Sequence, residues 1–275
     1  MSRTFRLTLE YDGTDFAGWQ AQAAATRTVQ GVLEAALEQV TGSRVAVTGA
    51  SRTDAGVHAE GQVASLASAT RLEASELRRA LDAVLPRDLG VRAVAEGAEG
   101  FHARRDARAK RYRYAVWNGR DRSPLRARRF HHVRAALDLH AMRAAAARVI
   151  GTHDFRSFQT GSAEWLAEGR AEGRERSTVR TVLSVDLRGE AGGELRLEVR
   201  GSGFLRHMVR TLAGTLLEVG RGRREPASLG IVLDARDRKA AGPTAPALGL
   251  TLVEVEYDPR EDAPASGESG GIPGR

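Results

Sequence analysis

A short run in the first quarter of the chain places a carboxylate and a guanidinium among small side chains. Asp54 and Arg52 lie within Ala50-Ser51-Arg52-Thr53-Asp54-Ala55-Gly56. In one interpretation this run is a tight turn, in which Asp54 accepts hydrogen bonds from nearby backbone N–H groups. In the other, the small neighbours leave room for Asp54 and Arg52 to approach a ligand closely. The residues alone favour the turn, whereas the second interpretation would make Asp54 the group that carries the chemistry.

His58, four residues after Asp54, raises the question of a metal site. Protein metal sites usually need three or more ligands. The sequence shows no cluster of further carboxylates and histidines around this pair. We therefore expect no bound metal, and a metal-dependent nuclease that uses Asp54 and His58 stays as an alternative.

A second run, from Arg104 to Tyr114, mixes cations with tyrosines. Alternate side chains of a strand share one face, and here these are Arg108, Lys110, Tyr112 and Tyr114. Such a face suits RNA, because cations bind phosphate and rings stack on unpaired bases. The alternative is a solvated edge strand whose arginines discourage aggregation. The residues leave these two interpretations open.

A third run begins with Gly201-Ser202-Gly203 and continues into a helical pattern. Spacings of three and four predict a packed helix face, formed by Phe204, Met208, Thr211, Leu212 and Thr215. Arg206 and Arg210 are four residues apart on a neighbouring face. Spacing alone favours a surface arginine pair over a pair that binds a ligand.

A fourth run, from Tyr11 to Gln20, contains the turn signal Asp12-Gly13 between aromatic residues. Trp19 in this run is either a core residue or a platform on which a base stacks. The pattern favours the core.

The periodicity of apolar residues predicts the elements that must position these runs. Alternation predicts strands at 5–11, 44–47, 62–67, 89–95, 108–117, 181–187, 195–199 and 250–257. Spacings of three and four predict helices from a Thr28 cap to Gly42, around 77–84 before Pro86, at 138–150, at 204–219 and at 229–233. The Asp54 run falls in the loop between the second and third strands.

Both halves of the chain mix strands and helices without strict alternation. This order predicts an α+β fold in which helices cover one face of an antiparallel sheet. The similar halves suggest duplication, although the sequence shows no clear repeat. Residues 160–177 and 259–275 are poor in apolar side chains, so we expect both to be mobile or disordered.

The composition limits the class of protein. The 275 residues are 41% hydrophobic and 28% charged, typical of a soluble globular protein. The absence of cysteine excludes disulfides, thiolate metal sites and a cysteine nucleophile, and it fits a cytoplasmic protein. No signal region or run of about 18 apolar residues is present, so we expect no membrane partner. The net charge of +7, carried almost wholly by arginine, makes nucleic acid a candidate partner.

Several runs, in this order, resemble the tRNA pseudouridine synthase A family, whose members isomerise uridines in the anticodon stem-loop of tRNA. The resemblance extends from Phe5 to about Tyr257. Its most specific motif is Arg52-Thr53-Asp54-Ala55-Gly56-Val57-His58-Ala59. The others are Tyr11-Asp12-Gly13-Thr14 with Gly18-Trp19-Gln20, Thr28-Val29-Gln30-Gly31, Phe101-His102-Ala103-Arg104, Arg111-Tyr112-Arg113-Tyr114, His153-Asp154-Phe155, Phe204 through Arg210, and Ala241-Gly242-Pro243-Thr244-Ala245-Pro246-Ala247.

The resemblance implies three catalytic residues. Asp54 aligns with the family's catalytic aspartate, and Arg210 with the arginine that pairs with that carboxylate. Tyr112 matches the tyrosine that stacks on the target uracil and takes part in removing a proton from the rejoined carbon. Because Asp54 and Arg210 come from different halves, the site would lie in a cleft between them.

The resemblance also implies the substrate-binding set and the partners. Arg52 matches the residue that helps to hold the nucleotide out of the stem, and Tyr112, His58 and Arg206 complete the expected set. The reaction is a redox-neutral isomerisation, so no cofactor and no metal are expected. The expected substrate is tRNA, at positions 38–40 of its anticodon stem-loop, and the expected assembly is a homodimer in the cytoplasm.

The fold that the resemblance implies is a pair of ferredoxin-like α+β domains whose antiparallel sheets join across a central cleft. Residues 1–105 would form the domain with the Asp54 loop. Residues 106–258 would form the domain with the tyrosine strand and the arginine helix, and 259–275 would be a tail.

The sequence departs from the family pattern at a few positions. Ser51 stands where glycine is common, and Ala17 and Ala21 replace bulkier or basic residues. The segment 160–177 is longer than expected. The main alternative is a non-catalytic RNA-binding protein of ferredoxin-like topology, which would account for the charge and the Arg/Tyr strand but not for the small residues around Asp54.

Overall fold

The structure is a computed structural model, and it describes residues 2–22, 26–161, 166–167 and 176–258. The tail at 259–275 lies outside the described residues, as does most of the segment 160–177. The expectations of mobility and disorder fall on these segments.

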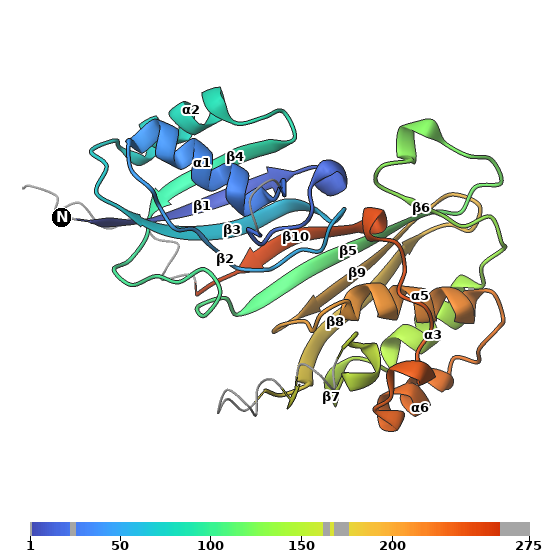
Figure 1. Ribbon diagram of the computed structural model, residues 1–275. Coiled ribbons are helices and arrows are strands. Elements are labelled where there is room, and N and C mark those ends of the chain that lie inside the picture. The colour runs from blue at the N-terminus through green and yellow to red at the C-terminus, as the bar shows by residue number, and fades with distance from the viewer. Residues whose placement is uncertain (1, 23–25, 162–165, 168–175, 259–275) are drawn as a thin grey trace, which may run out of the picture.

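The described strands form one mixed sheet of ten strands (Figure 1). Along the sheet the order is β4-β1-β3-β10-β5-β9-β8-β7, and the short strands β2 and β6 pair with β3 and β5. The strands are β1 (Arg3–Tyr11), β2 (Thr48–Gly49), β3 (His58–Ser68), β4 (Leu89–Glu96), β5 (Ala109–Trp117), β6 (His131–His132), β7 (Gly151–Asp154), β8 (Val179–Gly189), β9 (Glu194–Gly201) and β10 (Leu250–Glu256).

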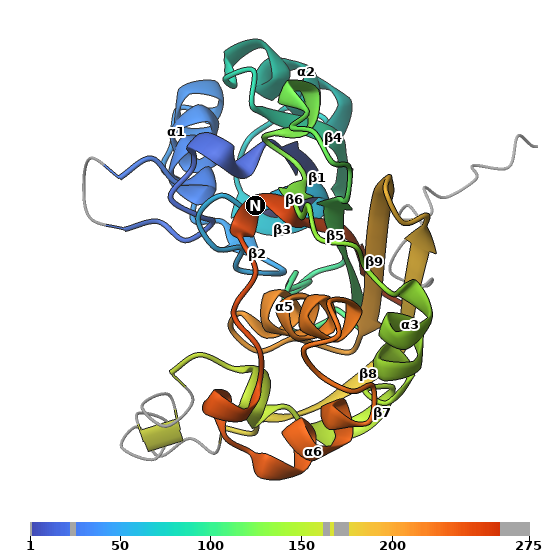
Figure 2. The same cartoon turned by 90° about the vertical axis from the view of Figure 1, so that its right-hand side faces the viewer.

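The helices gather in two groups, one toward each end of the sheet. The described residues form α1 (Val29–Thr41), α2 (Ala74–Val84), α3 (Leu139–Ala147), α5 (Met208–Gly220) and α6 (Ser228–Ala235). Helices α1 and α2 lie together near β4, β1 and β3, whereas α3, α5 and α6 lie together near β9, β8 and β7 (Figures 1 and 2). The predicted α+β class is thus confirmed. Within the described ranges, no helix has the length and apolar character that crossing a bilayer requires.

The first half, from β1 to β4, is built on the alternation seen in the sequence. Phe5, Leu7 and Leu9 are fully buried in β1, which pairs antiparallel with both β3 and β4. The Thr28 hydroxyl accepts a hydrogen bond from the Gly31 N–H at the start of α1, and Gly42 ends the helix with a φ of 73°. Both caps are those that the sequence predicted.

The second half, from β5 to β10, is centred on α5. Strand β5 pairs antiparallel with β9 and β10, and β9 pairs antiparallel with β8. The segment 241–247 runs beside α5 on its way from α6 to β10 (Figure 2). Its Gly242 N–H donates to the buried Thr215 hydroxyl at 2.9 Å, and its Ala245 N–H donates to the Arg210 carbonyl at 3.1 Å. The 241–247 segment is therefore fixed to the helix that carries Arg210.

Strand β10 joins the two halves into one sheet. It is antiparallel to β5 but parallel to β3, where Thr251 lies opposite His58 and Leu252 opposite Ala59. The short strand β6 is also parallel to its neighbour β5. The prediction of purely antiparallel sheets is therefore wrong at these two places. Alternation of side chains reveals which face is buried, but it carries no information about the direction of the neighbouring strand.

Two other predicted elements differ from the structure. The predicted strand at 44–47 is wrong, because only Thr48 and Gly49 pair with β3. Val45 and Val47 are nevertheless buried, so their apolar pattern reflects packing without ladder pairing. The predicted helix at 204–219 begins at Met208, because His207 adopts the left-handed φ of 62° and interrupts the helical backbone.

Candidate active site

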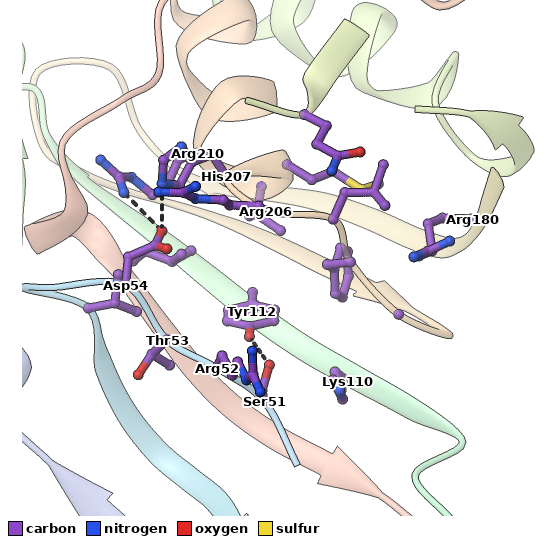
Figure 3. A pocket seen from close by; sticks show the side chains of 18 of the residues that line it. Ser51, Arg52, Thr53, Asp54, Lys110, Tyr112, Arg180, Arg206, His207 and Arg210 are labelled. Carbon is purple, nitrogen blue, oxygen red and sulfur yellow. Dashed lines mark hydrogen bonds and ion pairs between the residues drawn. The ribbon is translucent and has the colours of Figure 1, made fainter. Parts of the chain in front are cut away.

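A cavity of about 680 Å³ lies where the two halves meet (Figure 3). The first half lines it with residues of the loop before β3, from Ala50 to Asp54 and Val57. Strand β5 contributes Lys110 and Tyr112, and the run from Gly203 to Arg210 lines it from the second half. Residues from three of the runs singled out in the sequence therefore face one cavity.

The fourth run, around Trp19, supports the Asp54 loop from behind. The backbone N–H of Trp19 donates to the Thr53 carbonyl at 3.0 Å, and the Gly56 N–H donates to the Phe16 carbonyl at 3.3 Å. Gly18 has a φ of 97°, and a side chain there would approach the Thr53 carbonyl oxygen to 2.8 Å. Trp19 is 2% exposed, as the core interpretation predicted. This run thus holds the backbone of Thr53 next to Asp54.

Asp54 contacts two basic side chains of the second half. Its Oδ2 accepts a hydrogen bond of 2.9 Å from Nη1 of Arg210 and lies 3.4 Å from Nε2 of His207 (Figure 3). Both partners are anchored elsewhere. Arg210 Nε donates to the Ala245 carbonyl at 2.8 Å, and His207 Nδ1 lies 3.0 Å from the Thr160 hydroxyl. Asp54 therefore rests against two side chains whose orientation is already fixed.

The Asp54 carboxylate is stabilised in its ionised form. Burial by itself raises the pKa of Asp54. The hydrogen bond and charge of His207, followed by those of Arg210, outweigh burial and leave the pKa below the ordinary value of a carboxyl group. Asp54 is thus an anion at neutral pH, although only 29% of its side chain is exposed.

Tyr112 lies in the same cavity with its hydroxyl group 2.7 Å from the Ser51 hydroxyl. Its ring packs edge-to-face with Phe204, with 5.3 Å between the ring centroids. Burial raises the pKa of Tyr112 to about 12, and the negative charge of Asp54 adds to this effect while the Ser51 hydrogen bond opposes it. The phenol is therefore neutral at physiological pH. The serine that departs from the family pattern is its partner.

Arg52 and Arg206 are exposed residues that also line the cavity. Arg206 belongs to a second hollow as well, of about 360 Å³, which shares Asp54, His207 and Arg210 with the cavity. The remaining lining of this hollow comes from Thr53, Ala55 and residues between 17 and 22. The two hollows thus meet at Asp54.

His58 lies away from the other predicted site residues. It is 2% exposed and lines neither hollow. Its Nδ1 accepts a hydrogen bond from the Gly13 N–H at 3.1 Å, and its Nε2 lies 3.2 Å from the Leu248 carbonyl. Burial lowers the pKa of His58, which fits a neutral ring that donates through Nε2. The structure thus gives His58 a position that holds the two halves together, without contact to the cavity that holds Asp54.

The alternation of side chains along β5 divides its cations between the two faces of the strand. Arg111 and Arg113, which flank Tyr112, project from the opposite face of β5 and pair there with Glu198 at 3.3 and 3.1 Å. They do not line the cavity. Lys110, two residues before Tyr112, supplies the cation on the cavity side.

Some residues of the site were not singled out from the sequence. His207 lies within the motif from Phe204 to Arg210, and Arg180 lies outside every motif. The position of His207, three residues before Arg210 on the path into a helix, was the available signal for its place beside Asp54. Nothing in the sequence marked Arg180, because it reaches the cavity from β8.

Comparisons with known proteins agree with this arrangement. A family profile described as tRNA pseudouridine synthase matches residues 8–106 and 145–258. The tRNA pseudouridine synthase A of Myxococcus xanthus is 46% identical over 266 residues, which cover 97% of this chain and 95% of the relative. That of Brevibacillus brevis is 45% identical over 93% of this chain and 100% of the relative, and that of Chloroflexus aurantiacus is 46% identical over 94% and 90%.

The chain belongs to the tRNA pseudouridine synthase family. The resemblance predicted from the motifs is confirmed. The two matched ranges of this synthase contain Asp54 and Arg210 respectively. Strand β5 with Tyr112 falls between those ranges, and the longer alignments with the relatives cover 93% or more of the chain.

Proposed function

We propose that this synthase converts uridines of the tRNA anticodon stem-loop into pseudouridine, with Asp54 as its catalytic carboxylate. Family membership supports the reaction. The observation that carries the residue assignment is the 2.9 Å ion pair between Asp54 and Arg210, which are 156 residues apart in sequence and meet at one cavity.

The reaction requires a change of bonding at the sugar carbon. The bond from uracil N1 to ribose C1′ breaks, and a bond from C5 to C1′ forms. The proton on C5 leaves and N1 gains one, so nothing is oxidised or reduced. A carboxylate assists either by attacking the flipped nucleotide or by supporting departure of the base. Asp54 suits both roles because it is ionised and borders the cavity.

The contacts of Asp54 leave one oxygen for substrate. Arg210 and His207 both approach Oδ2. No side chain among the described residues bonds Oδ1 of Asp54, so this oxygen is available to the nucleotide. We expect Arg210 and His207 to keep the carboxylate charged and oriented while Oδ1 reacts.

Tyr112 is proposed to contact the flipped uracil and to assist removal of the C5 proton. Only 6% of Tyr112 is exposed, so the neighbouring Phe204 ring must shift for a base to stack on it. A neutral phenol accepts the C5 proton only if its own proton moves on. The Ser51 hydroxyl at 2.7 Å is in position to relay that proton, releasing its own proton to solvent. Arg52 and Arg206 are proposed to hold the extruded nucleotide.

We also propose that residues 1–105 and 106–258 form two ferredoxin-like domains. In support, the strand order β4-β1-β3-β2 of the first half has the same pattern as β10-β5-β9-β8 of the second. Along the chain, β1-α1-β2-β3-α2-β4 corresponds to β5-α3-β8-β9-α5-β10, with β6, β7 and α6 as additional elements of the second half. Family membership supports a homodimer in the cytoplasm, which sedimentation of the purified protein and fractionation of cells would test.

Replacement of Asp54 by Asn tests the proposed function. The amide has nearly the same shape but cannot act as a carboxylate, so pseudouridine formation should fall by about 1000-fold or more. Binding of tRNA should change by no more than about 3-fold, because Asp54 is not a phosphate ligand. Release of tritium from C5-labelled uridine in tRNA measures the first quantity, and filter binding the second. Full activity in this variant would remove Asp54 from the mechanism.

The same assay separates the rival functions. A non-catalytic RNA-binding protein would bind tRNA without tritium release in the wild type. A metal-dependent nuclease would shorten the RNA and stop when a chelator is added, whereas the synthase should leave the mass of the RNA unchanged and ignore the chelator. Cleaved product would contradict the proposed reaction.

A further inference from the structure

The part of the cavity beyond Tyr112, as seen from Asp54, is lined by cations. Lys110 lies two residues before Tyr112, about 7 Å along β5, on the same face of the strand. Arg180 of β8 lines this part as well, and both are separated from Asp54 by Tyr112 (Figure 3). Arg104, just before β5, is the third cation. These three residues are called the basic end.

The cations of the basic end lack carboxylate partners among the described residues. None of its three cations forms an ion pair with a carboxylate in the part of the chain that the structure describes. The other face of the same strand differs, because Arg111 pairs there with Glu198 at 3.3 Å and with Glu254 at 2.7 Å. Acidic residues thus neutralise the outer face of β5, while the cavity face remains positively charged.

These cations repel one another in the free protein. Burial, together with the smaller effects of the charges of Arg104 and Arg180, lowers the pKa of Lys110 to about 8. Burial also lowers the pKa of Arg104, with a contribution from the charge of Arg52. A cluster of this kind costs stability unless an anion fills it. Binding of a negatively charged ligand would relieve this unfavourable electrostatic free energy.

We propose that the basic end binds one backbone phosphate of the RNA strand next to the extruded uridine, and that Lys110 connects this phosphate to the catalytic loop. The proposal rests on the proposed function, because it takes the RNA to be the ligand.

The donors of the basic end suit a phosphate. Arg180 Nη1 donates to the Ser177 and Val179 carbonyls at 2.8 and 2.7 Å, so its guanidinium is positioned before RNA arrives and keeps further N–H groups for an oxygen. Lys110 donates one N–H to the Ala50 carbonyl at 2.6 Å and has two more. A tetrahedral anion accepts from several such donors at once.

The hydrogen bond from Lys110 to Ala50 gives the phosphate a route to the chemistry. Ala50 precedes Ser51, whose hydroxyl lies against that of Tyr112. The Ser51 N–H and carbonyl are both bonded to the buried Gln62 side chain, at 3.1 and 2.6 Å, so this stretch is rigid. A phosphate bound to the ammonium of Lys110 would therefore help to position, through Ala50 and Ser51, the loop that carries Asp54.

The test combines a double variant with neutral linkages in the RNA. Arg104→Gln with Arg180→Gln removes two cations, and Arg111→Gln on the outer face of β5 is the matched control. An anticodon-arm RNA is made with a single methylphosphonate at each position around the target uridine. Binding is measured across salt concentrations, and folding of each variant is checked by its thermal unfolding.

We expect the double variant to bind the unmodified RNA about 10-fold more weakly and to lose roughly 0.7–0.9 from the slope of log affinity against log salt, the amount for one phosphate contact. One methylphosphonate position should weaken binding to the wild type by a similar factor. That same position should have no further effect in the double variant. Arg111→Gln should keep the wild-type slope.

Three results would overturn the proposal. One is an unchanged slope in the double variant, and another is a wild type that tolerates every methylphosphonate. The third is binding of inorganic phosphate that the double variant loses while no linkage position matters, since the site would then hold a free anion. Pseudouridine formation by the wild type is scored separately, so failure of the phosphate site is distinguishable from failure of the proposed function.

Lys110 itself gives a second measurement. Lys110→Met should lower both affinity and the single-turnover rate at saturating RNA, whereas Lys110→Arg should restore affinity because it keeps the charge. A purely structural role predicts a loss of thermal stability in Lys110→Met with an unchanged salt slope, and that outcome would contradict the proposal.

Discussion

The ionised state of Asp54 results from a balance between its burial and its contacts with His207 and Arg210. Burial removes water from the carboxylate and favours its neutral form, whereas His207 and Arg210 favour the anion. Neither partner could hold the carboxylate without its own anchor, and for Arg210 this anchor is the Ala245 carbonyl. At the scale of single residues, the site therefore depends on the groups that anchor its two basic side chains as much as on those side chains.

Removal of Arg210 should move the pH dependence of the reaction. Because the pKa of Asp54 is lowered by its partners, the wild type should keep its active anion well into acid. In Arg210→Gln burial is opposed by His207 alone, so the pKa of Asp54 rises and activity should fall as pH drops from 7.5 to 5.5. The ratio of single-turnover rates at these pH values measures the shift. Arg206→Gln, four residues earlier and without contact to Asp54, should leave the ratio unchanged.

Tyr112→Phe tests the hydroxyl without removing the ring. The substitution keeps the packing against Phe204, so tRNA affinity should fall by no more than about 3-fold. The rate of pseudouridine formation should fall by about 100-fold or more if the hydroxyl takes part in proton transfer. Ser51→Ala removes only the partner of that hydroxyl and should cause a smaller loss. Unchanged turnover in Tyr112→Phe would exclude the hydroxyl from the mechanism.

At the scale of elements, the site depends on the close approach of α5 and the 241–247 segment. Gly214 in α5 lies against Pro243, and a side chain at this position would overlap the Pro243 carbonyl oxygen. The segment that would be displaced includes Ala245, whose carbonyl holds Arg210. The contact between helix and segment thus affects Asp54 through two intermediate residues.

Gly214→Ala should therefore reduce both stability and activity. We expect a loss of about 1–3 kcal/mol from overpacking and a fall in the single-turnover rate from displacement of Arg210. Gly230→Ala in α6 is the matched control, because nothing lies within 4 Å of a side chain there. It should be neutral or gain up to about 1 kcal/mol in a helix. Urea unfolding and single-turnover assays of the two variants give the comparison.

Helices and strands were predicted correctly where the local sequence pattern is compatible with only one structure. The alternation of Phe5, Leu7 and Leu9 predicted β1, and the Thr28 and Gly42 caps predicted the limits of α1. The predicted strand at 44–47 was wrong because Val45 and Val47 are buried without pairing to a strand. The late start of α5 was hidden as well, since a left-handed histidine has no signature in the sequence.

The site was predictable in its members and less so in their arrangement. Asp54, Tyr112 and Arg210 were named from the family motifs, because no local pattern relates residues 156 positions apart. His58 lies in the most specific motif and yet is buried at the junction of the halves. A sequence motif contains residues that support the fold as well as residues that take part in the chemistry, and it does not distinguish between them.

At the scale of the whole molecule, burial keeps two histidines neutral, His58 at the junction of the halves and His131 within the second half. His131 of β6 lies 3.2 Å from the Tyr114 hydroxyl, which in turn donates to the Pro246 carbonyl. Burial lowers the pKa of His131 to about 4, and the nearby charges of Arg221 and His132 act in the same direction. The unfolded chain binds a proton at this residue from about pH 6.5 downward, whereas the folded chain does so only near pH 4.

Acid should therefore destabilise the fold through His131. Between pH 6.5 and 4 the unfolded state binds more protons, so the free energy of unfolding falls as pH falls through this window. After allowance for partial exposure we expect His131 to contribute on the order of 1 kcal/mol to the loss between pH 7.5 and 5. Urea unfolding at both pH values should show a smaller loss in His131→Gln than in the wild type. The exposed His140→Gln should behave as the wild type.

The position of β10 has a consequence for biosynthesis. Among the described strands, the one that joins the halves comes last in the sequence, so it leaves the ribosome after the others. Until then the edge of β3 that it covers is open, and open edges invite association with other chains. A product that terminates before Leu250 would contain both Asp54 and Arg210 but not the strand between their halves. Only a polypeptide translated through β10 would then hold the two residues together over an RNA, so chains that stop earlier should be inactive as modifying enzymes.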